Sequence, residues 1–303
     1  MLGVLNYFSK NISNILKENF YGQPAEKLKT LEEIRIRSNG SIALKFANKQ
    51  EILRVKIDYD DILQTLQLMC DNSIYSYQNE ICNGYITVRG GHRVGISGNC
   101  VIENGKVINI KYISSINFRI ARQIIGCSSK ALQYILKLPD NTIYNTLIIS
   151  PPGAGKTTLL RDIIRNISTG IDEINFKGIN VGLVDERGEL AALYKGVPQN
   201  DIGIRTDVLE NIPKPIGIKM LVRSMAPQVI AADEIGTEQD VQAIEEAVCS
   251  GVKGIFTAHG ENKEELMKNP CLKELVEKKL IERVIFLKTN ELGRTMEVEE
   301  KVC

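Results

Sequence analysis

A near match to a phosphate-binding loop constrains the fold of this chain more than any other feature. Residues 147–162 read LIISPPGAGKTTLLRD and fit the pattern G-x-x-x-x-G-K-[ST], except that Ser150 stands where the first glycine is expected. The loop follows an apolar strand and precedes a helix with apolar residues at helical spacing, which is the context that such a loop requires. The pattern therefore predicts a nucleotide-binding loop between a strand and a helix.

The residue types in this loop explain how it would hold phosphates. Gly153 and Gly155 let consecutive backbone N–H groups approach a phosphate at the positive end of a helix. Lys156 would reach the β- and γ-phosphates, and the hydroxyl of Thr157 would bind Mg²⁺. The two prolines after Ser150 fix φ near about −65°, so the chain can turn there without a glycine. We expect ATP and Mg²⁺ to bind at Ser150, Pro151, Pro152, Gly153, Ala154, Gly155, Lys156, Thr157 and Thr158.

Other strands of the second half also end in polar residues. QVIAADEIG ends in two adjacent carboxylates, of which Asp233 would bind Mg²⁺ and Glu234 would polarise the attacking water. NVGLVDERGEL carries Glu186, which either lies in a solvated loop or activates water in place of Glu234. GIFTAHG carries His259, either a structural residue or a sensor of the γ-phosphate. Because ligands bind at the carboxyl ends of parallel strands, we expect these residues to share one sheet edge.

The first part of the chain, residues 1–125, has an α+β pattern. Apolar residues at helical spacing over 2–16 and 58–70 predict helices, and EIRIRS and SIALKFA alternate as strands between them. Gly90-Gly91 and Asn104-Gly105 are turn signals that predict two β-hairpins, because the favoured hairpin turns need positive φ. The last hairpin strand leads into SINFRIAR. These residues predict a small separate domain.

Residues 126–303 alternate strands with helices. TLIIS, INVGLVD, QVIAAD and GIFTA read as strands, while TTLLRDIIRNI, GIKMLVRSMA and the segment from Thr237 read as helices. Such alternation predicts a mostly parallel sheet with helices on its faces. The domain boundary is expected near LPDNTIYN, residues 138–145, or a little before the helix that precedes it, and we place it between residues 125 and 126.

Composition narrows the possible partners. With 38 basic and 37 acidic residues, 6% aromatic residues and no tryptophan, the chain offers neither a basic groove nor a stacking platform, so we expect no specific nucleic acid. It shows no apolar run of membrane-spanning length and no secretory signal, which predicts a cytoplasmic location. Seven scattered cysteines without C-x-x-C spacing indicate reduced thiols.

The motifs together resemble a known family. ISPPGAGKTTLLRDIIR, VGLVDERGELAA, GIRTDVLENIPKPIGIKMLVRSMAPQVIAADEIG and FTAHG are similar to the stage III sporulation protein AA family of endospore formers, itself similar to the type II and type IV secretion traffic ATPases. NGYITVRGGHRVGISG and INFRIAR extend the resemblance into the first half. Ser150 is the main departure from the expected motifs, and it bears on the geometry of the loop.

The resemblance to this family implies a fold, an oligomeric state, a location and roles for particular residues. It implies a RecA-like P-loop ATPase domain after the smaller α+β domain, in a homo-oligomer of six subunits. This ATPase would act from the mother-cell cytoplasm, peripherally at the engulfing membrane, on membrane-embedded channel components that join mother cell and forespore. In related traffic ATPases, Glu186 matches a candidate catalytic base in an acidic box and His259 matches a histidine box. Arg119 and Arg122 match arginines that reach the nucleotide.

A P-loop site open to water lacks positive charge opposite the γ-phosphate, and an arginine from another subunit can supply it. Arg119, Arg122 and Arg223 are candidates, although each could instead be a surface ion-pair partner. A nucleic-acid motor of the RecA or helicase type is the alternative function, since the same core serves both classes. A nucleotide switch without turnover is the third possibility; a missing acid would favour it, yet both strand ends carry carboxylates.

Overall fold

The computed structural model describes residues 2–47, 49–290 and 293–300. The chain forms two compact units, one of Met1–Arg122 with Tyr194–Val197 and one of Gln123–Leu193 with Pro198–Cys303. Each unit has its own hydrophobic core. No helix within the described ranges is long and apolar enough to cross a membrane.

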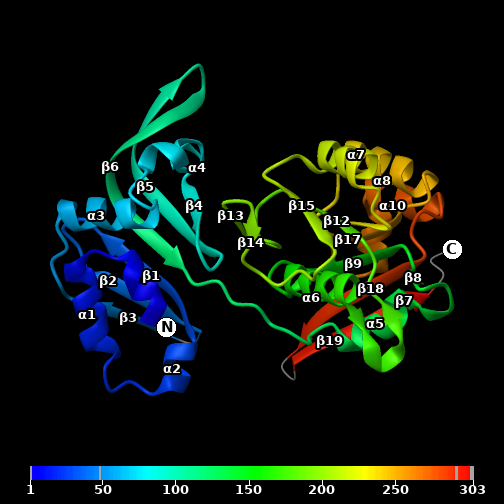
Figure 1. The fold of residues 1–303 in the computed structure, drawn as a ribbon, viewed down its shortest axis with the longest axis horizontal. Helices are drawn as coiled ribbons and strands as arrows, with labels where there is room; N and C mark the ends of the chain where they lie inside the picture. Colours follow the sequence, from blue (N-terminus) through cyan, green and yellow to red (C-terminus); the bar gives the residue numbers. More distant parts are fainter. Residues whose placement is uncertain (1, 48, 291–292, 301–303) are drawn as a thin grey trace. The chain divides into compact units, whose positions relative to one another are not determined.

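The first unit is built on an antiparallel sheet with the strand order β3-β2-β1-β6-β5-β4 (Figure 1). Both predicted hairpins are confirmed: β4 pairs with β5, and β5 with β6. The turn residues Gly90, Gly91, Asn104 and Gly105 all have positive φ, as the tight hairpin turns require. The strands are β1 (Leu31–Arg37), β2 (Ile42–Phe46), β3 (Lys49–Leu53), β4 (Tyr85–Val88), β5 (His92–Glu103) and β6 (Lys106–Arg119).

Helices cover one face of this sheet, and one of them differs from the prediction. The helical segment expected over 2–16 is divided at Ser9, whose hydroxyl accepts the N–H of Ile12 at 3.3 Å and donates to Asp61 at 2.7 Å. A serine that caps a helix start in this way ends the preceding turn and begins a new helix. The helices are η1 (Leu2–Tyr7), α1 (Lys10–Phe20), α2 (Ala25–Lys29), α3 (Tyr59–Met69), η2 (Ile74–Tyr77) and α4 (Gln78–Cys82).

The second unit contains a seven-stranded sheet with the order β15-β12-β16-β17-β9-β18-β19. All neighbouring pairs are parallel except β18 with β19. The strands predicted from TLIIS, INVGLVD, QVIAAD and GIFTA are confirmed, whereas β15, β18 and β19 were not predicted. The strands are β9 (Thr146–Ser150), β12 (Val181–Asp185), β15 (Thr206–Glu210), β16 (Val229–Ala232), β17 (Lys253–His259), β18 (Arg283–Asn290) and β19 (Gly293–Glu300).

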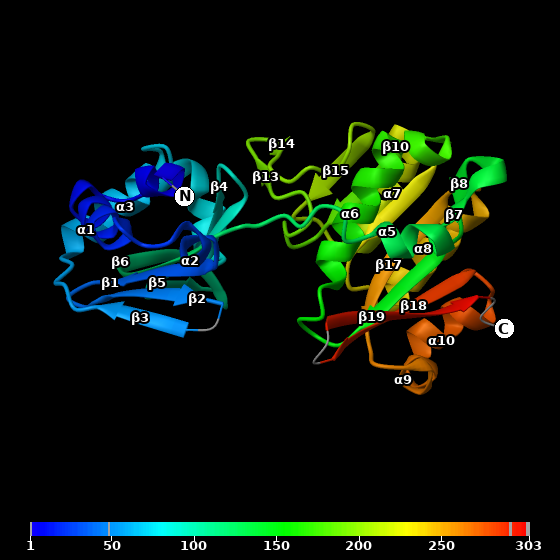
Figure 2. The ribbon, with the colours of Figure 1, turned by 90° about the horizontal axis from the view of Figure 1, so that it is seen from below.

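Helices lie on both faces of this sheet (Figures 1 and 2). Alternate residues of β9 enter the two cores: Leu147 and Ile149 pack with α7, α8 and α10, while Ile148 packs with α5 and α6. This two-sided burial explains why the central strands are apolar throughout. The helices are α5 (Ser129–Ile135), α6 (Lys156–Thr169), α7 (Lys214–Met225), α8 (Glu238–Cys249), α9 (Lys263–Lys268) and α10 (Pro270–Glu277).

Short elements complete the chain. The two-stranded pairs are β7 (Leu136–Lys137) with β8 (Thr142–Ile143), β10 (Gly170–Ile171) with β11 (Phe176–Lys177), and β13 (Leu193–Tyr194) with β14 (Val197–Pro198). Two single turns of 3-10 helix are η3 (Leu138–Asp140) and η4 (Asp172–Ile174).

Candidate nucleotide-binding site

The loop between β9 and α6 has the backbone that phosphate binding needs. Gly153 and Gly155 have φ of 77° and 91°, a left-handed conformation that glycine adopts without strain. Gly155 is also the N-cap of α6, so the helix begins directly at Lys156. Ser150 is fully buried at the end of β9, and its hydroxyl donates to the carbonyl of Pro151 at 3.0 Å. The chain thus leaves the strand with serine in place of the first glycine.

The end of β16 meets the start of α6 through a carboxylate. Thr157 Oγ1 donates to Asp233 Oδ2 at 2.6 Å, and the hydroxyl of Thr257 donates to Asp233 Oδ1. Hydroxyl and carboxylate oxygens are donors that Mg²⁺ accepts, and phosphates and water usually complete its coordination. The described part of the chain contains no cluster of three or more His, Cys, Asp or Glu side chains that could hold a metal. The oxygens of Thr157 and Asp233 are ligands of the kind that a nucleotide-bound Mg²⁺ uses.

A second contact group surrounds the carboxylate of Glu234. Its Oε1 lies 2.9 Å from Lys156 Nζ and 3.1 Å from His259 Nε2, and its Oε2 lies 2.6 Å from Arg187 Nη1. Burial raises the pKa of the Glu234 carboxyl, but the hydrogen bond and charge of Lys156 and the charges of Arg187 and His259 outweigh burial. The pKa therefore lies below its ordinary value, and the group is held as a carboxylate.

Glu234 also has an unusual backbone. Its φ of 54° is left-handed, which costs a residue with a side chain on the order of 1–3 kcal/mol. The backbone N–H of Glu234 donates to Thr257 Oγ1 at 2.8 Å, and that of Ile235 donates to the carbonyl of Thr257 at 2.8 Å. Bonds from β17 thus hold the turn in which Glu234 lies.

The two carboxylates at the end of β12, Asp185 and Glu186, make different contacts. Asp185 is 2% exposed and accepts backbone N–H groups from Glu189, Leu190 and Ala191 at 2.9, 2.9 and 2.8 Å. Burial raises its pKa, although these hydrogen bonds oppose the shift. Asp185 therefore shapes the loop after β12. Glu186 forms an ion pair with Lys214 at the start of α7.

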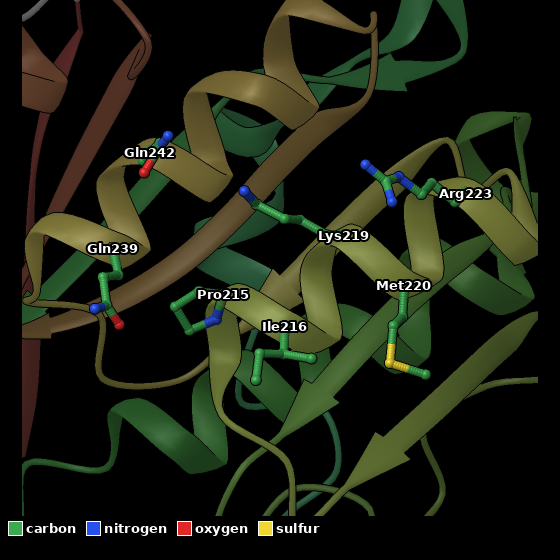
Figure 3. Close-up of a pocket in the computed structure, with 7 residues that line it drawn as sticks. All are labelled: Pro215, Ile216, Lys219, Met220, Arg223, Gln239 and Gln242. Atoms are coloured by element: carbon green, nitrogen blue, oxygen red, sulfur yellow. The ribbon is translucent and has the colours of Figure 1, made fainter.

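The candidate arginines have other described surroundings. Arg223 is exposed and lines a groove of about 480 Å³ between α7 and α8 (Figure 3). Arg119 Nε lies 3.8 Å from Glu33 Oε1, and Arg122 donates to the carbonyl of Leu31, both within the first unit. The structure brings together Lys156, Thr157, Asp233, Glu234 and His259. The described contacts of Glu186, Arg119 and Arg122 involve other residues, and Arg223 lines the groove between α7 and α8.

Sequence reasoning missed two members of this group. Arg187 follows Glu186 in the chain, and a solvated loop was one interpretation of that segment. Thr257 belongs to GIFTAHG but received no role. The charge of Arg187 and its position after a strand could have indicated a role in the site. The residues that follow neighbouring parallel strands lie at the same sheet edge, so a cation there can contact the carboxylates.

Comparisons with known proteins agree with the motifs. Residues 3–300 match the family described as "Sporulation stage III, protein AA". Over 283 residues the chain is 39% identical to stage III sporulation protein AA of Bacillus subtilis, covering 93% of this chain and 91% of that protein. It is also 31% identical over 167 residues to uncharacterized protein ycf45 of Porphyra purpurea, covering 54% of this chain and 27% of that protein.

Solved structures confirm the predicted fold class. The ATPase DotB of Legionella pneumophila has a TM-score of 0.59 and 16% identity, with 96% of this chain and 80% of that chain covered. The pilus retraction motor PilT with bound ADP has a TM-score of 0.56 and 16% identity, with 90% and 80% covered. Identity this low shows the fold alone: a RecA-like α/β domain preceded by a smaller α+β domain.

Proposed function

The chain belongs to the family of sporulation stage III protein AA, and on that premise we propose that it binds and hydrolyses ATP with Mg²⁺. The observation that carries this proposal is the convergence of Lys156, Thr157, Asp233 and Glu234 at one edge of a parallel sheet. These side chains follow two strands, β9 and β16, that are separated in the sheet only by β17. A lysine, a hydroxyl and two carboxylates are what phosphoryl transfer to water requires.

Each residue has a distinct task in this proposal. The backbone N–H groups of the loop and Lys156 bind the β- and γ-phosphates, and Thr157 and Asp233 bind the metal ion. Mg²⁺ would neutralise the charge that develops on the phosphate oxygens. Glu234 accepts the proton of the attacking water, a role that its ionised state supports. His259 lies beside Lys156 and Glu234, where it would contact the γ-phosphate.

The wider function follows from the family. We propose that ATP hydrolysis drives assembly or operation of a membrane-embedded, secretion-like channel between mother cell and forespore, with the chain in the mother cell at the inner face of the membrane. The names of its similar proteins, a sporulation protein, an ATPase and a pilus motor, support this proposal. A homo-oligomer of six subunits would supply Arg119, Arg122 or Arg223 to a neighbouring site.

Equilibrium binding of a fluorescent ATP analogue and phosphate release test the proposal. With Mg²⁺, the wild-type chain should bind the analogue and release phosphate, and Lys156→Ala should lose both. Lys177→Ala removes an exposed lysine from β11 and should behave as wild type. Unchanged phosphate release in Lys156→Ala would show that the loop is not the site of hydrolysis.

A further inference from the structure

Arg187 carries an inference that rests on the proposed function and goes beyond it. Its guanidinium is bound to Oε2 of Glu234, while Lys156 and His259 are bound to Oε1. Three nitrogen groups that converge on one anion are the arrangement expected around a terminal phosphate. The Glu234 carboxylate thus has the contacts that a γ-phosphate would make. We propose that Arg187 contacts the γ-phosphate of ATP bound to the same subunit. When ATP binds, Arg187 and Lys156 would leave the carboxylate of Glu234 and contact the γ-phosphate instead.

The loop that carries Arg187 has a fixed backbone. Asp185 accepts the N–H groups of the residues just after it, and Arg161 Nε donates to the carbonyl of Leu190 at 2.9 Å. Gly188 has a φ of 64°, so the chain turns directly after Arg187. A loop fixed in this way holds the Cα of Arg187 near the sheet edge both with and without bound ATP.

The side chain of Arg187, in contrast, has room to move. It is 62% exposed, whereas that of Lys156 is 7% exposed. A long, exposed arginine can exchange one anion for another without repacking a core, and its planar guanidinium suits two phosphate oxygens as well as two carboxylate oxygens. A hydrogen-bonded backbone and an exposed side chain together fit a residue that senses which anion is present.

The move of Arg187 and Lys156 from Glu234 to the γ-phosphate would make hydrolysis depend on the presence of that phosphate. While Arg187 and Lys156 are bound to Glu234, their charges make its carboxylate a weaker acceptor for the proton of a water. When a γ-phosphate takes both cations, Glu234 is released to accept that proton. ADP lacks the γ-phosphate and leaves Arg187 on the carboxylate. Arg187 therefore discriminates ATP from ADP, and it does so before any chemistry occurs.

Binding of ADP and of the non-hydrolysable analogue AMP-PNP, each with Mg²⁺, tests this inference by isothermal titration calorimetry. Arg187→Gln should weaken AMP-PNP binding about tenfold, the scale of one charge-assisted hydrogen bond, and leave ADP binding within about twofold. The matched control Arg54→Gln removes an exposed arginine of the first unit and should change neither.

A second variant separates the two roles of Arg187. Glu234→Gln removes the competing anion and should strengthen AMP-PNP binding. Adding Arg187→Gln to it should still weaken AMP-PNP binding, because the contact to the phosphate is lost. If Arg187 only restrained Glu234, the second substitution would have no effect, and the inference would be wrong. Equal weakening of ADP and AMP-PNP by Arg187→Gln would also overturn it.

The same titrations distinguish this inference from the proposed function. If the wild-type chain binds neither nucleotide, or if Lys156→Ala binds both as well as wild type does, both are wrong. If wild type binds AMP-PNP, Lys156→Ala does not, and Arg187→Gln binds both nucleotides like wild type, only the role of Arg187 is wrong.

Discussion

The backbone N–H of Glu234 is hydrogen bonded to the hydroxyl of Thr257 at 2.8 Å, and the same hydroxyl donates to Asp233. One buried threonine on β17 therefore contacts the carboxylate of Asp233 and the backbone of Glu234, just after the end of β16. Together with the bond from the N–H of Ile235 to the carbonyl of Thr257, this contact holds the turn in which Glu234 has its left-handed φ.

Removal of this hydroxyl should affect stability and turnover together. Thr257→Val has nearly the same shape but leaves the N–H of Glu234 and an oxygen of Asp233 without this partner. We expect the free energy of unfolding to fall by about 1–3 kcal/mol, the cost of a buried group left unsatisfied. Urea unfolding and phosphate release would measure both effects. Thr257→Ser keeps the hydroxyl and should retain most of the activity; equal loss in both variants would contradict the role of the hydroxyl.

The two candidate bases make different contacts, so their substitution should have different effects. Glu234 is bound to Lys156, whereas Glu186 is paired with Lys214. Glu234→Gln should slow single-turnover hydrolysis by roughly 10²-fold or more, the scale for a lost proton acceptor, while ATP stays bound. Glu186→Gln should retain most of the rate. The reverse pattern would assign water activation to Glu186.

Arginines supplied in trans can be tested by mixing variants. Arg119→Ala and Arg223→Ala should bind ATP like wild type but hydrolyse it slower by roughly 10³-fold or more, the contribution of an arginine finger. Mixing either with Lys156→Ala should restore part of the activity, because a hybrid interface pairs an intact loop with an intact arginine. Activity that is independent of protein concentration, without rescue on mixing, would exclude a shared site.

Glu210 should make the stability of the second unit depend on pH. Burial and the charge of Asp185 raise the pKa of Glu210 from 4.5 to about 7, although the N–H of Leu193, 2.7 Å from its Oε1, opposes the shift. Between these values the folded chain binds more protons than the unfolded chain, so stability falls as pH rises. Thermal unfolding at several pH values should show this decline in wild type.

Substitution of Glu210 checks the cause of that decline. Glu210→Gln removes the titrating group, and the melting temperature should then change less between pH 4.5 and about 7. Glu103→Gln, at an exposed position beside the β5–β6 turn, should leave the decline as in wild type. A slope that Glu210→Gln does not reduce would show that other groups control it.

Much of the second unit could be predicted because its signals are local. The loop before α6, the apolar strands and the helix start at Thr237 each depend on residues close in sequence, and the structure confirms these elements. β15, with the sequence TDVLE, was not predicted because polar and apolar residues do not alternate along it. In the structure all five residues are half-buried. β18 contains the apolar run VIFL, which is typical of a buried strand.

The contact between Arg187 and Glu234 could not be predicted in the same way. It depends on β12 lying next to β16, although β15 and α7 separate these strands in the chain. Strand order in a parallel sheet is set by how helices pack across it, so neighbouring strands need not follow one another in sequence. The left-handed conformation of Glu234 was likewise hidden, because a glutamate carries no signal for it.

The position of β9 has a consequence for how the site is lost. β9 is hydrogen bonded to β17 on one side and β18 on the other, and helices cover both of its faces. Amide protons of such a central strand exchange with solvent only when the whole domain opens. The candidate phosphate loop begins where this strand ends, at Ser150. The point where the chain enters this loop is therefore fixed to a part of the second unit that opens last on unfolding.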